Sequence, residues 1–218
     1  MKLLLTSSGV TNKSITKALF DLVDKKPKDT FISFIPTAAN FEKGDKGWFI
    51  NDLNNLRNLA LKGIDIVDIS ALPKEIWLPR LEVADVLFFS GGNTSHLMHW
   101  INKSGLVEFL PKLLETRVYG GISAGSIVTN PTLALSSDDK KIYYEEKTGY
   151  RSEAALHFVD FYIRPHLNSP HFSHAREEVL REISKNFDGT IYGLDDQSAL
   201  KVVDGKVEVV SEGMWVKI

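Results

Sequence analysis

The sequence predicts an α/β fold of three layers, in which a doubly wound and mostly parallel sheet is covered by helices on both faces. Short apolar runs alternate with segments of helical periodicity in the first part of the chain, the order found in sheets built from βαβ units. The run 86–89 is Val-Leu-Phe-Phe, which is typical of a strand buried on both faces. Because the chain has 218 residues and nothing in its composition marks a second unit, we expect one domain over 1–218.

Five strands are predicted in order along this first part. The apolar runs lie at 3–6, 31–35, 64–69, 86–89 and 118–121. Helices are predicted where apolar residues recur at helical spacing, namely at 15–23, at 48–61, from 97 onward and at 106–114. The segment 73–79, which begins and ends with proline, is predicted as a connection.

The pattern of apolar and charged residues changes after residue 128. Residues 136–152 are charged and aperiodic, and they predict a surface loop that could act as a lid over a site. A strand is predicted at 158–163 and a helix at 175–183. Three short strands then follow, at 190–194, 199–203 and 207–210. The last two form a small β-hairpin extension, because Asp204-Gly205 is typical of a tight hairpin turn.

Composition narrows the class of partner. The 26 basic and 28 acidic residues give a formal charge of −2, so no overall field favours nucleic acid or an anionic membrane, and we expect a small-molecule substrate. The absence of cysteine excludes disulfides and a thiol nucleophile. No signal-peptide core or long apolar stretch is present, so a soluble cytoplasmic protein, monomer or homodimer, is expected.

The stretch Gly121-Ile-Ser123-Ala-Gly125 has the pattern of a nucleophile elbow. In such an elbow a strand turns sharply into a helix and exposes the serine oxygen at the carboxyl end of the strand. Glycines on both sides let the flanking segments approach closely. The alternative is a Gly-rich strand-to-helix loop that packs closely or holds a phosphate, and the motif by itself leaves both open.

A serine nucleophile needs a base and a group that orients the base. His166 follows a predicted strand and a proline, which suits a rigidly placed imidazole, whereas the other histidines have helix-like or loop contexts. For the orienting acid the spacing leaves open Asp196, which follows the strand ending at residue 194, and Asp138 or Asp139, which follow the elbow. The order Ser123, Asp138, His166 would also fit an α/β-hydrolase.

Two further groups of residues allow more than one interpretation. A metal site of His166, His171 and His174 is a rival to the base, although the spacing fits no familiar ligand motif. Backbone N–H groups at Gly91 or Gly92, together with that of Ala124, could hold an oxyanion, or the glycines could serve a plain turn.

The loop at residues 6–11, Thr-Ser-Ser-Gly-Val-Thr before a helix, also looks like an anion cradle. It supports a different class of protein, a non-catalytic phosphate- or flavin-binding module.

Four motifs in order along most of the chain resemble the peptidase E (aspartyl dipeptidase) family of serine peptidases, which is related to cyanophycinase. They are Phe-Ser-Gly-Gly-Asn-Thr at 89–94, Gly-Ile-Ser-Ala-Gly-Ser at 121–126, Arg-Pro-His at 164–166 and Gly-Leu-Asp-Asp at 193–196. The resemblance implies a class I glutamine amidotransferase-like, flavodoxin-like fold. It also implies Ser123 as nucleophile and His166 as base. For the third member the family offers positions matching both Asp196 and Asp138, and the cyanophycinase-like pattern favours Asp196.

The resemblance also implies a reaction and a substrate. It implies a serine peptidase that forms an acyl-enzyme and cleaves short peptides after an N-terminal aspartate, without metal or other cofactor. Gly91, Gly92 and Ala124 are implied around the oxyanion, and Asn93 and Arg176 at the substrate. An arginine at the start of a helix could hold a carboxylate, or it could pair with a neighbouring glutamate. An esterase or amidase with the same residues is the alternative activity.

Overall fold

The computed structural model describes residues 1–136 and 138–218, with the side chain of Asp138 outside the description. Its larger sheet has seven strands in the order β3-β2-β4-β5-β1-β8-β9. The first five strands in this order are joined by parallel pairings, and β8 and β9 continue the sheet in antiparallel register. The strands are β1 (Lys2–Thr6), β2 (Phe31–Ile35), β3 (Gly63–Ile66), β4 (Val86–Phe89), β5 (Val118–Ile122), β8 (Ser198–Val203) and β9 (Lys206–Ser211). The predicted mostly parallel sheet is confirmed.

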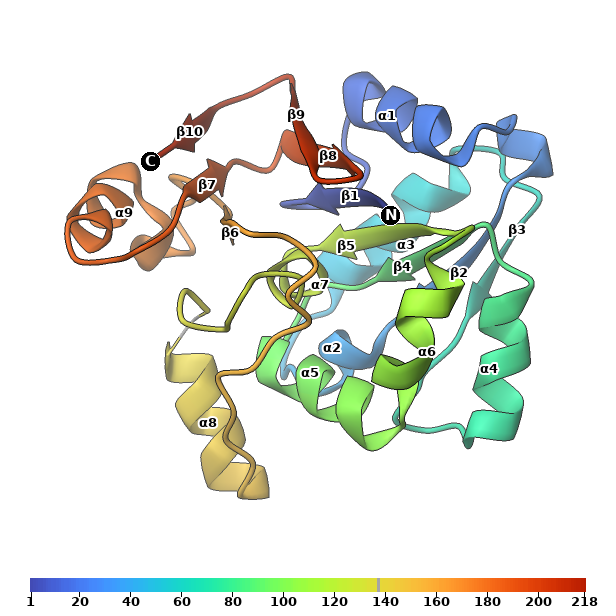
Figure 1. The fold of residues 1–218 in the computed structure, drawn as a ribbon, viewed down its shortest axis with the longest axis horizontal. Helices are drawn as coiled ribbons and strands as arrows, with labels where there is room; N and C mark the ends of the chain where they lie inside the picture. The colour runs from blue at the N-terminus through green and yellow to red at the C-terminus, as the bar shows by residue number, and fades with distance from the viewer. Residues whose placement is uncertain (137) are drawn as a thin grey trace.

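Helices cover both faces of this sheet (Figure 1). Alternate residues of one strand face opposite layers: Leu4 packs with α1 and α3, whereas Leu3 and Leu5 pack with α4, α5 and α6. Both layers exclude water, which explains the uninterrupted apolar runs. The helices of the first part of the chain are α1 (Lys13–Val23), η1 (Pro27–Asp29), α2 (Thr37–Asn40), α3 (Gly47–Arg57), α4 (Lys74–Glu82), α5 (Thr94–Lys103), α6 (Leu106–Leu113) and α7 (Ala124–Ile127).

A second sheet of three strands lies beside the first, in the order β10-β7-β6 (Figure 1). Its strands are β6 (Tyr162–Pro165), β7 (Ile191–Leu194) and β10 (Trp215–Lys217), and the remaining helices are α8 (Asp138–Thr148), η2 (Ser173–Ala175) and α9 (Glu177–Ser184). The predicted hairpin is confirmed: Asp204 and Gly205, with φ of 48° and 79°, join β8 to β9. The separate small sheet was not predicted, because local patterns do not say which strands pair.

Two segments predicted as connections or loops are helices. The first, α4, contains Pro79, which removes one backbone hydrogen bond, but Trp77 and Leu81 on the same helix are buried in the core. The second, α8, replaces the predicted loop over 136–152. Its buried residue Tyr144 has a hydroxyl 2.7 Å from Nδ1 of His99 and 3.2 Å from Nδ1 of His96, both on α5. Tertiary packing therefore holds a helix that has little apolar periodicity of its own.

Two predicted strands are shorter in the structure. The run 64–69 contributes only β3, which ends at Ile66, and the strand predicted at 158–163 is β6, which begins at Tyr162. Within the described residues no helix combines the length and the apolar character needed to cross a membrane.

Candidate active site

Ser123 stands at the sharp turn between β5 and α7. Its φ of 46° and ψ of −103° lie outside the regions that L-residues favour, and its N–H donates to the Thr6 carbonyl of β1 at 3.1 Å. A Cβ on Gly121 would come within 2.7 Å of the backbone of Gly125, and a Cβ on Gly125 would overlap the carbonyl of Phe89. The predicted strand-turn-helix context of the serine is present, with a helix of four residues.

The structure brings Ser123, His166 and Asp196 into one chain of hydrogen bonds. Ser123 Oγ lies 3.0 Å from His166 Nε2, and His166 Nδ1 lies 2.7 Å from Asp196 Oδ1. With the ring proton on Nδ1, the imidazole donates to the carboxylate and accepts from the serine hydroxyl. The hydrogen bond from His166 is the main reason that the pKa of Asp196 is lowered, so this carboxyl stays ionised near neutral pH.

Ser7 holds this chain of hydrogen bonds together from β1. Its hydroxyl donates to Asp196 Oδ1 at 3.0 Å and accepts the backbone N–H of His166 at 2.8 Å. Ser7 is fully buried, and the same segment contributes Thr11, whose hydroxyl donates to the Asp196 carbonyl. The sequence pattern predicts an anion cradle at Ser7 and does not indicate this role. Its position directly after a strand was the available signal.

The predicted oxyanion donors surround the serine. Gly91 lies against it, since a Cβ there would be 3.5 Å from Ser123 Cβ. Gly92 has a φ of 135°, and a Cβ on it would overlap the carbonyl of Ala38, so only glycine fits. Within the described chain, the N–H groups of Gly91, Gly92 and Ala124 donate to no protein acceptor. These groups are therefore free to bind an oxygen beside Ser123.

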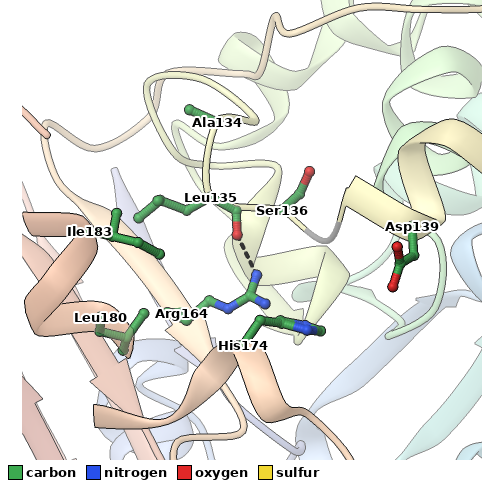
Figure 2. Close-up of a pocket in the computed structure, with 8 residues that line it drawn as sticks. All are labelled: Ala134, Leu135, Ser136, Asp139, Arg164, His174, Leu180 and Ile183. Atoms are coloured by element: carbon green, nitrogen blue, oxygen red, sulfur yellow. Dashed lines mark hydrogen bonds between the residues drawn. The ribbon is translucent and has the colours of Figure 1, made fainter. Parts of the chain in front are cut away.

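A cleft with basic side chains adjoins Ser123. Lys140 of α8, Arg164 of β6 and His174 of η2 line it together with Ser123 and His166, and we call it the cationic cleft. Arg164 and His174 also line a neighbouring pocket of about 260 Å³. Figure 2 shows the Arg164 guanidinium at the centre of that pocket, donating to the Leu135 carbonyl, with His174 beside it.

Comparison with known proteins assigns the family. The sequence model of peptidase family S51 matches residues 3–210. The chain belongs to peptidase family S51. Peptidase E of Streptomyces coelicolor is 31% identical over 183 residues, which cover 80% of this chain and 72% of that protein. An uncharacterized peptidase of Pasteurella multocida is 24% identical over 172 residues, covering 78% and 80% of the two chains.

A solved structure supports the same fold. A Listeria monocytogenes protein with the provisional name peptidase E has a TM-score of 0.78 at 24% identity, over 97% of this chain and 98% of that one. The resemblance to peptidase E is therefore confirmed, and this S51 member is a serine-type peptidase.

Arg176 and Asn93, which the resemblance implies at the substrate, make contacts within the protein, and their part in substrate binding stays a prediction. Arg176 precedes α9 with its side chain 54% exposed, 4.0 Å from Glu178, and among the described residues it does not line the cationic cleft. Asn93 is buried and caps α5: its Oδ1 accepts the His96 N–H and its Nδ2 donates to the Lys140 carbonyl. Arg176 therefore lies near a neighbouring glutamate, and Asn93 stabilises the start of α5. Arg164, two residues before the base, and Lys140 were missed by the sequence analysis.

The other candidates for the orienting acid and for a metal site are Asp138, Asp139 and the histidines near His166. Asp139 lines the pocket beyond Arg164, and the side chain of Asp138 lies outside the described residues, so only Asp196 is seen against His166. Among the described side chains, no group of three or more His, Cys, Asp or Glu is arranged to hold a metal ion. His166 instead stacks on Phe172, with ring centroids 4.3 Å apart.

The hydroxyls of the loop at 6–11 are used within the protein. Thr6 donates to the Gly121 carbonyl, and Ser7 and Thr11 donate to Asp196. An anion cradle is formed mainly by backbone N–H groups, and the hydroxyls of Thr6, Ser7 and Thr11 that could assist one are already used here. The loop connects β1 to the hydrogen-bond chain of Ser123, His166 and Asp196.

Proposed function

We propose that this S51 peptidase hydrolyses short peptides through an acyl-enzyme on Ser123 and prefers an aspartate at the amino terminus. The hydrogen-bond chain from Ser123 through His166 to Asp196 carries the proposal, because it is the arrangement that activates a serine hydroxyl. Ser123 is then the nucleophile, His166 the general base and Asp196 the orienting acid.

The proposed reaction follows from this geometry. Ser123 Oγ attacks the carbonyl carbon while His166 Nε2 takes its proton, and Asp196 stabilises the imidazolium. The N–H groups of Gly92 and Ala124 bind the oxyanion, each contributing about 3 kcal/mol to transition-state stabilisation. The imidazolium returns the proton to the leaving amine as the C–N bond breaks, and water then hydrolyses the ester with the same base.

The cationic cleft supports the preference for an acidic residue. Lys140 and Arg164 present fixed positive charge beside the serine, and His174 adds hydrogen-bonding nitrogen atoms. Lys140 is ion-paired with Glu42 at 3.1 Å and donates to the Gly92 carbonyl, so its ammonium is held in place. A substrate carboxylate in this cleft would have its charge compensated. We assign the recognition of aspartate to Lys140 and Arg164, in place of Arg176.

Hydrolysis of Asp-Ala, Glu-Ala, Asn-Ala and Ala-Ala tests the proposal. We expect Asp-Ala to have the highest kcat/KM, and Ser123→Ala to lower kcat by about 10⁵-fold or more, because the nucleophile is removed. A fluorophosphonate probe should label the wild type and not this variant. Peptide hydrolysis that survives in Ser123→Ala would overturn the proposal. Turnover of esters without peptides would assign the site to an esterase.

A further inference from the structure

Helix α3 presents two residues one turn apart to the loops that follow β4 and β1. Cζ3 of Trp48 lies 3.6 Å from the point where Gly91 would carry a Cβ, and Ser123 Cβ lies 3.5 Å from the same point. Oδ1 of Asp52 lies 3.2 Å from the corresponding point on Gly9. The indole therefore borders the nucleophile across Gly91, and the carboxyl faces the loop that carries Ser7.

Asp52 is a buried carboxyl that the fold leaves without a partner. It is 7% exposed, and no residue in the described part of the chain gives it a hydrogen bond or an ion pair. Burial, and to a lesser degree the charge of Asp196, raise its pKa to about 7. Partial desolvation disfavours the charged form of this carboxyl, and no contact among the described residues compensates for it. A ligand with a positive group would supply the missing partner.

The surroundings of Asp52 suit a cation rather than an anion. Asp196, which is ionised and half-exposed, adds a second negative charge. Lys46 lies 5.7 Å from the centre of the Trp48 ring, but its ammonium donates to the Ala39 and Glu42 carbonyls. The protein therefore supplies no cation to Asp52 from this neighbour.

The two glycines let α3 approach the loops closely. A side chain on Gly9 would contact the Asp52 carboxyl, and one on Gly91 would fill the space between Trp48 and Ser123. Basic side chains from α8 and β6 line the cationic cleft next to Ser123. The acidic Asp52 of α3 lies in a different direction, against Gly9. Opposite charges in these two regions would orient a substrate that carries both a carboxylate and an ammonium group.

We propose that Asp52 binds an ammonium group of the peptide substrate, with Trp48 as the apolar wall between that group and Ser123. The inference rests on the proposed function and adds a second recognition element to it. The ammonium has two sources, the α-amino group of the first residue or the side chain of a lysine in the second.

Asp52→Asn tests the inference, with Asp45→Asn, an exposed residue in the loop before α3, as the matched control. The substrates are Asp-Ala, N-acetyl-Asp-Ala and Asp-Lys. We expect Asp52→Asn to lower kcat/KM for Asp-Ala by about 10- to 100-fold, mainly through KM, because a charged hydrogen bond is lost. The ratio of kcat/KM for free to acetylated peptide should fall by the same factor. Asp45→Asn should change neither value.

Each alternative outcome has its own meaning. A loss confined to Asp-Lys would keep the site and assign the ammonium to the second residue. Equal losses for free and acetylated Asp-Ala, or no loss at all, would overturn the inference. A wild type that is labelled by fluorophosphonate but cleaves none of the peptides would overturn the proposed function itself, and the inference with it.

Two checks separate binding from folding. Thermal unfolding and fluorophosphonate labelling, which needs no ammonium group, report whether the catalytic hydrogen-bond chain is intact in Asp52→Asn. Trp48→Leu is the second variant, and it should raise KM for Asp-Ala severalfold without altering the charge of the site. An unchanged KM in Trp48→Leu would contradict the role of Trp48 as the apolar wall beside the ammonium group.

Discussion

The two sheets contribute different members of the catalytic group. Ser123 follows β5 in the seven-stranded sheet, whereas His166 follows β6 and Asp196 follows β7 in the three-stranded sheet. The larger sheet is covered by helices on both faces, while α9 packs against β7 of the smaller one (Figure 1). The proposed nucleophile is thus held by the large sheet, and the proposed base and acid by the small sheet that packs on the same core.

The two sheets share one apolar core, to which Ile163 and Leu194 of the small sheet contribute, and a few polar groups join them at the site. The large sheet alone fixes the strained backbone of Ser123, through the Thr6 carbonyl and the close approach at Gly121 and Gly125. The position of His166, in contrast, depends on Ser7, whose hydroxyl bonds both to its N–H and to Asp196. The fold therefore shapes the nucleophile within one sheet, but activates it only through the junction between the two.

The largest effect, on kcat, is expected from removing the negative charge of Asp196, which follows β7 of the small sheet. Asp196→Asn should lower kcat by about 10⁴-fold with little change in KM, because an amide favours the wrong tautomer of His166. Steady-state kinetics with Asp-Ala measures this. Asp160→Asn is the matched control, since Asp160 also contacts a histidine, His157, but on the surface. A loss below tenfold would show that another acid, such as Asp138, orients the base.

A smaller effect, on the free energy of unfolding, is expected from Asp52, whose burial beside the large sheet destabilises its charged form. Its folded-state pKa, about 7, lies above the ordinary aspartate value of 3.8, so the folded state binds more protons between these values and stability falls as pH rises through them. Asp52→Asn removes this loss. The variant should gain on the order of 3 kcal/mol relative to wild type between pH 4 and pH 8, measured by urea unfolding. Parallel pH–stability curves would contradict this.

The smallest effect is expected at the junction itself. Ser7→Ala should lower kcat about tenfold with KM unchanged, because His166 and Asp196 remain but are held less firmly. It should also cost about 1–2 kcal/mol of stability, since the buried His166 N–H loses its acceptor. Ser8→Ala, the adjacent half-buried serine, is the control. If kcat is unchanged while stability falls, Ser7 serves folding and not the position of the base.

Most of the large sheet could be predicted from the sequence, because each of its strands is a short apolar run bounded by turn residues. The failures share one cause, which is that packing replaced a local signal. Pro79 stands inside α4 because Trp77 and Leu81 are buried, and α8 is held by Tyr144 against α5. The three-stranded sheet was missed because pairing of β10 with β7 depends on residues far apart in the chain.

In the candidate site, too, some residues could be predicted from local patterns and others are placed only by packing. The elbow was predictable because the Gly-x-Ser-x-Gly spacing encodes its own geometry, and His166 because it directly follows a strand, whereas the spacing left Asp196 and Asp138 both open. Arg176 stays a prediction for the substrate contact, and its side chain lies at the surface before α9, near Glu178. Lys140 stands beside Ser123 through the packing of α8, and no local pattern showed this helix.

The sequence by itself predicted the sharp turn at Ser123, because the Gly-x-Ser-x-Gly spacing encodes it, and the Thr6 carbonyl of β1 then holds the serine N–H. Only the tertiary structure decided which acid meets His166, which basic side chains reach the serine, and that Asp52 is buried without a partner. These are contacts between segments up to about 190 residues apart, such as Ser7 with Asp196. Local propensity carries no information about such distances, because they are set by how two sheets and their helices pack together.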